Sequence, residues 1–242
     1  AVRVMQAAMA VNGVVDVDCD APEVVAVASA FLPPTGAVYG RPGKPRSHWL
    51  YLSPFEKTIV FKDLNRSPDT ATLIEIRVNH QSMAPPSVHH SGEIVTWDGT
   101  LGDVLPYTND DVLRFVRLAS TSAIAIRYYN PPGNRHDWCL ALAGTLLRFG
   151  LNEEEAMKVI LEAARVARDP EVKDRLQEVR STFSHDDEDP IKAHKALRDT
   201  MGDVGAMFLK TLQRIWGTSS GTFIMNDKHT IIVNGPAGRE NI

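Results

Sequence analysis

Two aspartates lie two positions apart in a short apolar run near the start of the chain. The run from Val14 to Asp18 reads VVDVD, and a β-strand would place Asp16 and Asp18 on one face, about 6 to 7 Å apart. Carboxylates placed in this way can hold divalent cations together. Acidic residues that simply end a strand before a helix give the same pattern, so both interpretations stay open. Asp20 is expected beyond the end of the strand.

A basic stretch follows, with the sequence YGRPGKPRSH, and it contains no acidic residue. A loop stiffened by its prolines could present Arg41, Lys44 and Arg46 to a triphosphate at little entropic cost. Ser47 could donate a hydrogen bond, and His48 is expected to open the next strand. The alternative is a solvated basic turn with a structural histidine. No Gly-Lys-Ser or Gly-Lys-Thr occurs in the chain, so a Walker phosphate loop is excluded.

A third carboxylate lies in the run TLIEIRV, which ends at Val78. Strand alternation predicts that Leu73, Glu75 and Arg77 share the open face, while the isoleucines and Val78 face the core. Glu75 would then complete a two-metal cage with the two aspartates, and we expect the three carboxylates to approach within about 4 to 6 Å, with His48 nearby. A single glutamate on the polar face of a half-exposed strand is the ordinary alternative.

The elements that must position these residues differ between residues 1–105 and 106–242, with a boundary near Pro106. The first region carries most of the prolines and short β-branched runs, which predict strands joined by connections too short for helical crossovers. We therefore expect a mixed or antiparallel sheet. The predicted strands are 14–18, 37–39, 48–52, 72–78 and 93–97, and a helix is predicted from Pro22 through Phe31.

The second region shows apolar residues at helical spacing, so the fold class is α+β, a sheet domain followed by a mostly α-helical domain. Gly150 is predicted to end one helix, and Asn152 with Glu155 predicts a capping box at the start of the next. The predicted helices are 110–120, 140–149, 152–168, 169–180, 191–201 and 204–216. We also predict a loop at 186–189 and a hairpin that pairs 223–225 with 230–233.

Composition limits the classes of function. The 242 residues carry 26 basic and 30 acidic side chains, a net charge of −4, so any polyanion site must come from a local basic cluster. The apolar runs are far shorter than the roughly 18 residues of a membrane span, and Cys19 and Cys139 are expected to remain unpaired in a reducing cytoplasm, of a cell or of an infected host. The chain ends in a Gly/Pro-rich stretch that suits a linker, and we expect it to be a segment of a longer protein.

Taken together, the motifs resemble the bifunctional DNA primase/polymerase domains of the archaeo-eukaryotic primase superfamily, as found in phages and plasmids. The resemblance covers roughly residues 2–99. The motifs that carry it are Asp16-Val-Asp18, Arg46-Ser47-His48, Ile74-Glu75-Ile-Arg77 and Pro85-Pro-Ser87-Val-His89.

This resemblance implies a sheet like an RNA-recognition motif and a nucleotidyltransferase activity. Its carboxylates, here Asp16, Asp18 and Glu75, would hold two Mg²⁺ or Mn²⁺ ions, while His48 and the basic stretch would hold the incoming nucleoside triphosphate. Single-stranded DNA template and primer would be the other substrates. The segment with Ser87 and His89 would shape the wall of the pocket.

The helical region also resembles the one that follows such catalytic domains, through the stretch that leads from Gly133 into Leu151. Arg135 and His136, at a predicted helix start, could contact the phosphates of template or primer, and a downstream helicase-like partner is expected. The rival hypothesis is a non-catalytic module that binds nucleic acid or assembles a replisome.

Overall fold

The computed structural model describes residues 13–78, 81–129, 133–184 and 190–217, together with short strands at 224–225 and 231–232. Within these residues, six strands form one antiparallel sheet in the order β4-β5-β1-β3-β2-β6. The strands are β1 (Val14–Cys19), β2 (Val38–Arg41), β3 (Lys44–Leu52), β4 (Ile59–Lys62), β5 (Thr72–Arg77) and β6 (Thr96–Trp97). The predicted α+β class is confirmed, and of the two arrangements left open, mixed or antiparallel, the sheet is antiparallel.

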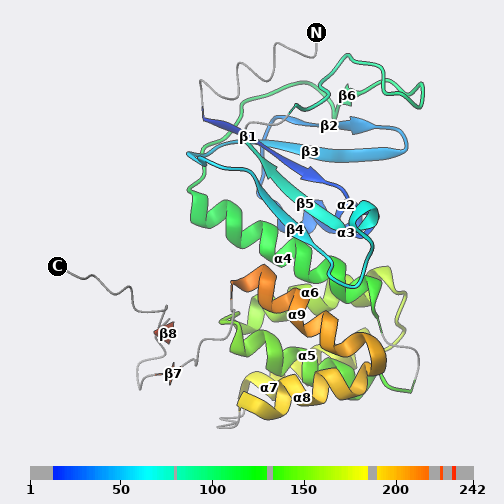
Figure 1. Ribbon diagram of the computed structural model, residues 1–242, viewed down its shortest axis with the longest axis vertical. Coiled ribbons are helices and arrows are strands. Elements are labelled where there is room, and N and C mark those ends of the chain that lie inside the picture. The colour runs from blue at the N-terminus through cyan, green and yellow to red at the C-terminus, as the bar shows by residue number, and fades with distance from the viewer. Residues whose placement is uncertain are drawn as a thin grey trace, which may run out of the picture.

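Helices cover one face of this sheet and then form the second half of the molecule. Figure 1 shows the sheet at one end, α5 to α9 at the other end, and α4 between them. The helices are α2 (Pro22–Phe31), α3 (Pro68–Ala71), α4 (Asn109–Arg127), α5 (Arg135–Arg148), α6 (Glu153–Val166), α7 (Val172–Ser184), α8 (Pro190–Thr200) and α9 (Gly205–Trp216), with a 3₁₀ turn at Gly202–Val204. In the described helices we find none that is both long and apolar enough to cross a membrane.

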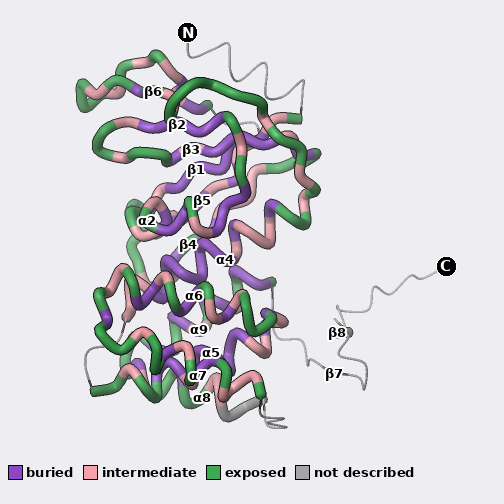
Figure 2. Tube along the Cα trace, turned by 180° about the vertical axis from the view of Figure 1, so that it is seen from behind, coloured by how far each residue is buried: buried purple, intermediate pink, exposed green. Residues whose placement is uncertain are grey.

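The two faces of the sheet differ in chemistry because side chains alternate along each strand. Val15, Val17, Tyr51 and Ile76 point to one face and are buried in the main apolar core. Figure 2 shows the continuity of buried chain from the strands into the helices. The residues between them in the sequence point to the opposite face, which carries the acidic side chains described below.

One main core serves both regions of the chain. Helix α4, which follows the predicted boundary at Pro106, packs against α2, and buried side chains such as Val27 and Val116 belong to the same apolar cluster. The backbone on either side of Pro106 also bonds to the sheet, since Leu52 N donates to Leu105 O and Tyr107 N donates to Leu52 O. The sheet and the helical region are therefore joined by apolar packing as well as by the chain.

The basic stretch predicted as a loop is instead most of a β-hairpin. Only two residues make the turn between β2 and β3, and Arg41 pairs with Lys44 across it. The hairpin needs Gly40, because a Cβ at this position would lie 2.5 Å from the carbonyl oxygen of Lys44. Arg46 adopts φ 50°, and its carbonyl accepts a hydrogen bond from the Trp49 indole at 2.8 Å. These contacts determine the backbone path of the hairpin, which the sequence pattern did not predict.

Other predictions need smaller corrections. Leu73 is fully buried in the main core, although alternation had placed it on the open face with Glu75. β4 and α3 lie in a stretch for which the sequence predicted no element. Helix α4 extends well past the predicted end at Ser120, because the hydroxyls that follow are satisfied inside the packed helix: Thr121 donates to the carbonyl of Arg117 at 2.7 Å.

The remaining helices match predicted ones, with ends that differ by up to five residues; the largest difference is at α5, which begins at Arg135 and not at residue 140. The capping box of Asn152 and Glu155 is present, and Gly150 follows α5 with a left-handed φ of 77°. Strands β7 (Ile224–Met225) and β8 (Ile231–Ile232) pair as the predicted hairpin, whose turn lies outside the described residues. The predicted loop at 186–189 also lies outside them. Both cysteines are buried free thiols.

Candidate metal centre

The sheet brings together acidic and basic side chains from three neighbouring strands. In the β1–β3 pair Asp18 lies opposite His48, and in the β1–β5 pair it lies opposite Glu75. Asp16 lies opposite Arg77. Residues directly opposite each other in an antiparallel pair share a face, so all of these side chains lie on the face opposite the main core. This face is called the acidic face below.

Three carboxylates on the acidic face could hold a metal ion. Asp18, Asp20 and Glu75 each offer an oxygen, and these oxygens lie within 4.8 Å of one another; we call this group the acidic triad. Asp20 directly follows β1, as predicted, and is held by two backbone bonds, since Asp20 N and Ala21 N both donate to Leu73 O. The β1–α2 connection therefore brings Asp20 back beside the strand end.

Asp18 supplies an independent indication that the triad binds a cation. Its side chain is only 4% exposed, and one oxygen, Oδ1, has no hydrogen-bond partner among the described residues. The other oxygen, Oδ2, lies 2.7 Å from Arg77 Nη1. A buried carboxylate oxygen without a partner is costly, and a hard cation such as Mg²⁺ or Mn²⁺ prefers oxygen ligands. The residues of the triad thus fit a divalent cation.

Basic groups surround the triad and balance part of its charge. Lys44 Nζ lies 3.1 Å from Asp20 Oδ1 and 3.6 Å from Asp18 Oδ1. Arg77 Nε also donates to Glu75 Oε2 at 2.6 Å. The sequence placed Arg77 on the same face as Glu75 but assigned it no role; the alternation of β5 was the signal that could have revealed this pairing.

Burial raises the pKa of Asp18 to about 6, and His48 and Lys44 beside it offset only part of that rise. A proton therefore competes with a cation for this carboxylate in mildly acidic solution.

We expect the affinity of the protein for Mn²⁺ to fall as the pH is lowered through about 6, approaching a tenfold loss per pH unit below it, because Asp18 must be ionised to bind a cation. Isothermal titration between about pH 5 and pH 8 measures the effect, with circular dichroism at each pH as a check on folding. An affinity that stays constant across this range in the folded protein would show that Asp18 does not bind the ion.

Asp16 has a different environment from Asp18. It is fully buried, and His48 Nδ1 lies 3.0 Å from its Oδ2 and 3.2 Å from its Oδ1. Oδ2 also accepts hydrogen bonds from Tyr39 Oη at 3.3 Å and from Ser82 Oγ. Burial alone would raise the pKa of Asp16, but His48, the hydrogen bond from Ser82 and the charge of Arg77 lower it below the ordinary value.

Asp16 holds His48 in one orientation. The imidazole stacks on the ring of Tyr39, with centroids 4.5 Å apart and planes 3° from parallel, and its Nε2 lies 3.7 Å from Asp18 Oδ1. Burial would lower the pKa of His48, but Asp16 raises it above the ordinary value. His48 thus links the buried Asp16 to the acidic triad.

The predicted carboxylate cage is therefore rearranged. Asp18 and Glu75 lie together as expected, but the third member of the group is Asp20, whereas Asp16 lies outside the triad with its oxygens bonded to other side chains. Ligation of a metal by Asp16 stays a prediction. Ser82, which bonds Asp16, was not singled out in the sequence, and no pattern there points to it.

The predicted triphosphate clamp is divided among separate ion pairs. Of its three cations only Lys44 reaches the triad, whereas Arg41 pairs with Glu93 and Arg46 pairs with Asp98. Arg46 and its partner are both about two-fifths exposed, so this pair can open at little cost.

The remaining predicted residues lie around this centre without a described contact to the triad. Ser47 is buried and precedes His48 on β3, so alternation directs it to the other face. Ser87 bonds through its backbone, accepting from Val95 N at 2.9 Å. His89 Nδ1 lies 2.8 Å from Ser91 Oγ. A wall-forming role for Ser87 and His89 stays a prediction.

Arg135 and His136 make contacts within the helical region. Arg135 Nη1 lies 3.1 Å from Asp169 Oδ1, and its guanidinium lies over the ring of Tyr129 at 5.4 Å. His136 Nδ1 lies 2.7 Å from Glu178 Oε1. His136 therefore joins α5 to α7, and Arg135 joins α5 to the residues that follow α4 and precede α7. Phosphate binding by the two side chains stays a prediction.

Comparisons of this chain with models of protein families, with curated proteins and with solved structures found no match. The resemblance to primase/polymerase domains therefore rests on the motifs in the sequence.

Proposed function

We propose that this chain is a metal-dependent nucleotidyltransferase, a DNA primase/polymerase that adds nucleotides to a primer on a single-stranded template. The observation that carries the proposal is the buried Asp18, whose Oδ1 accepts no hydrogen bond from the described residues and lies in the acidic triad beside Lys44 and His48. A carboxylate group that can hold divalent cations next to phosphate-binding side chains is what nucleotidyl transfer requires.

Asp18, Asp20 and Glu75 would hold the ions. Two Mg²⁺ or Mn²⁺ ions held there would supply the positive charge that lowers the pKa of a primer 3′-hydroxyl and offsets the charge of the β- and γ-phosphates. Arg77 keeps Asp18 and Glu75 in place by bonding both carboxylates.

Lys44 and His48 would bind the triphosphate. Lys44 already lies against the triad at the start of β3. A phosphate that enters the site could therefore replace Asp20 and Asp18 as the partner of the Lys44 ammonium group. Asp16 accepts at Nδ1 of His48, which leaves Nε2 directed toward Asp18 and the reacting phosphates. Preorganised donors of this kind cost little reorganisation during the reaction.

Arg41 and Arg46 would join the clamp by exchanging their carboxylate partners for phosphate oxygens. Ser47 is buried on the other face and would support the hairpin. The helical region would position template and primer, or contact a helicase-like partner further along the replication machinery.

One observation favours the rival hypothesis of a non-catalytic nucleic-acid-binding module. Arg41 and Arg46, two of the three predicted clamp cations, are already neutralised by Glu93 and Asp98. In such a module the carboxylates would hold the fold together and would not bind substrate.

Primer extension tests the proposal. A labelled primer on a single-stranded DNA template, with deoxynucleoside or ribonucleoside triphosphates and Mg²⁺ or Mn²⁺, should be lengthened by the wild-type chain. It should also be lengthened by Asp199→Asn, which removes a carboxylate about half exposed on α8 of the helical region. Glu75→Gln should lose the activity. If the wild-type chain binds Mn²⁺ and DNA but extends no primer and joins no nucleotides, the non-catalytic hypothesis is correct.

A further inference from the structure

β4 leaves one edge of the sheet open. It is the terminal strand of the sheet, and in the described part of the chain it pairs with β5 alone. Along its other edge, alternate backbone N–H and C=O groups point away from the sheet. Such an edge is a template for an added strand, and proteins that do not use it usually block it.

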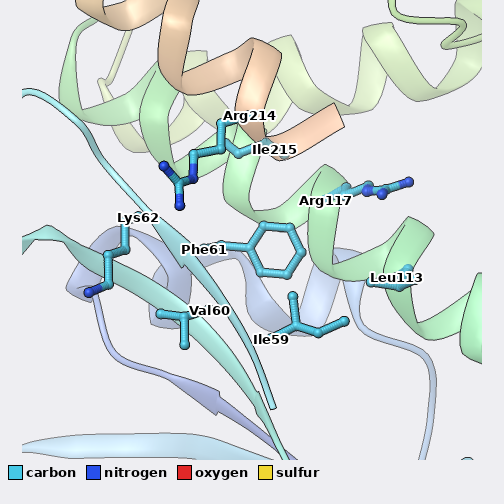
Figure 3. Close-up of a pocket in the computed structure, with 8 residues that line it drawn as sticks. All are labelled: Ile59, Val60, Phe61, Lys62, Leu113, Arg117, Arg214 and Ile215. Atoms are coloured by element: carbon cyan, nitrogen blue, oxygen red, sulfur yellow. The ribbon is translucent and has the colours of Figure 1, made fainter. Parts of the chain in front are cut away.

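A cavity of about 200 Å³ lies along this edge. All four residues of β4 line it from one side, and Leu113 and Arg117 of α4 with Arg214 and Ile215 of α9 line it from the other. Figure 3 shows the ring of Phe61 in the middle, with Lys62 and the guanidinium of Arg214 on one side of it and Arg117 on the other. The cavity thus has an apolar centre between two cationic ends.

The cations of this cavity form no ion pair within the described residues, although Asp110 on the same helix attracts Arg117 at longer range. Lys62, Arg117 and Arg214 line it with no acidic residue among the lining side chains, and within the described residues none of the three pairs with a carboxylate. Arg117 Nε is buried and has no acceptor there. By contrast, Arg114, one helical turn before Arg117, pairs with Glu155. Arg117 is half-buried as a residue, and a buried nitrogen that no acceptor meets is costly, so an anion that reached it would be favoured.

We propose that this cavity, called the β4 groove below, binds an extended, acidic peptide segment of a partner protein. The segment would add to β4 as a further strand. The backbone of the peptide would pair with the open edge, and its apolar side chains would pack on Ile59 and Leu113, which are half-buried in the lining. Its carboxylates would reach Lys62, Arg214 and Arg117. A peptide fits better than a nucleic acid because the strand edge offers alternating donors and acceptors that match a peptide backbone. The inference is independent of the acidic triad and of the proposed function.

Synthetic peptides test this binding mode. The probe is a fluorescein-labelled hexapeptide of alternating glutamate and valine, and the charge control is the same peptide with lysine in place of glutamate. Two further glutamate peptides carry N-methyl groups on alternate backbone nitrogens, one in each register. Fluorescence anisotropy should show binding of the glutamate probe and none of the lysine peptide. One N-methylated peptide should lose affinity about tenfold while the other keeps it, because only alternate nitrogens of an added strand face β4.

A double variant that reverses the charge of two exposed cations of the groove tests their role in binding. Lys62→Glu with Arg214→Glu should weaken the glutamate probe about tenfold or more and reduce the dependence of its binding on salt. Lys173→Glu, an equally exposed charge reversal on α7, should leave binding unchanged. Circular dichroism confirms that both proteins fold.

Several results would overturn the proposal. Equal affinity for the two N-methylated peptides would exclude strand addition. A single-stranded oligonucleotide that competes with the probe and is weakened in parallel by the double variant would make the groove a nucleic-acid site. Sedimentation that shows self-association of the wild-type chain, abolished by the double variant, would identify a second copy as the occupant.

Discussion

Asp18→Asn should lower the affinity of the protein for Mn²⁺ by about 100-fold or more and abolish nucleotide incorporation. The reason is geometric: Asp18 belongs to the acidic triad, is nearly buried, and carries an oxygen that accepts no hydrogen bond from the described residues. An asparagine keeps the size and one carbonyl oxygen but removes the negative charge on which a divalent cation depends. Titration with Mn²⁺ followed by calorimetry measures the affinity directly.

The same substitution should not weaken the metal-free fold. Burial raises the pKa of Asp18 to about 6, above its ordinary value of 3.8, so the folded protein takes up a proton there more readily than the unfolded chain. The contribution of Asp18 to stability therefore falls as the pH rises from about 4 to about 6. At neutral pH, Asp18→Asn removes an unfavourable buried charge, and we expect its midpoint of urea unfolding without metal to equal or exceed that of the wild type.

Asp98→Asn is the matched control, because it removes a carboxylate that is about two-fifths exposed and pairs with Arg46. It should bind Mn²⁺ like the wild type. Unchanged Mn²⁺ affinity in a folded Asp18→Asn protein would remove the acidic triad as the metal site, whatever the fate of incorporation.

The second large effect is expected from Arg127→Met, which should lower the free energy of unfolding by about 3–5 kcal/mol. The side chain of Arg127 is 6% exposed and joins its own helix, α4, to two other parts of the chain. It pairs with Glu23 of α2 at 2.8 Å and with Asp63, which follows β4, at 2.9 Å. Asp63 is fully buried, and its other described side-chain donor is Tyr128 at 2.8 Å. Methionine keeps much of the packing volume but removes the closer counterion of the buried Asp63, leaving Arg66 Nε at 4.0 Å from its Oδ2.

Urea denaturation at neutral pH measures this loss, and Arg198→Met is the control. Arg198 is half exposed and lies 3.6 Å from Asp199, so its removal should cost no more than about 1 kcal/mol. Burial would raise the pKa of Glu23, but the hydrogen bond from Arg127 lowers it below 4.5. The difference between wild type and Arg127→Met should therefore shrink as Glu23 is protonated in acid. A loss below about 1 kcal/mol at neutral pH would show that packing, and not this ion-pair network, joins α2 to α4.

Local patterns in the sequence determined the elements and much of the acidic face. Alternation in VVDVD and TLIEIRV was enough to put Asp18 and Glu75 on the polar side of their strands, and the Asn152 capping box with Gly150 marked helix ends correctly. These features depend on contacts within a few residues, which is why the sequence alone predicts them. The prediction that helix α4 ends at Ser120 was wrong. The hydroxyl-bearing residues at 120–122 are buried in the packed structure, and α4 continues through them.

Only the tertiary structure decided which side chains meet. The order β5-β1-β3 places Glu75 and His48 on either side of Asp18, and strand order depends on packing between segments far apart in the chain. Asp20 enters the triad because the strand end turns back against Leu73, while Ser82, 66 residues away, takes an oxygen of Asp16. No local period encodes such long-range contacts. The sequence therefore showed which residue types could bind a metal, but the tertiary structure determined which of them lie together.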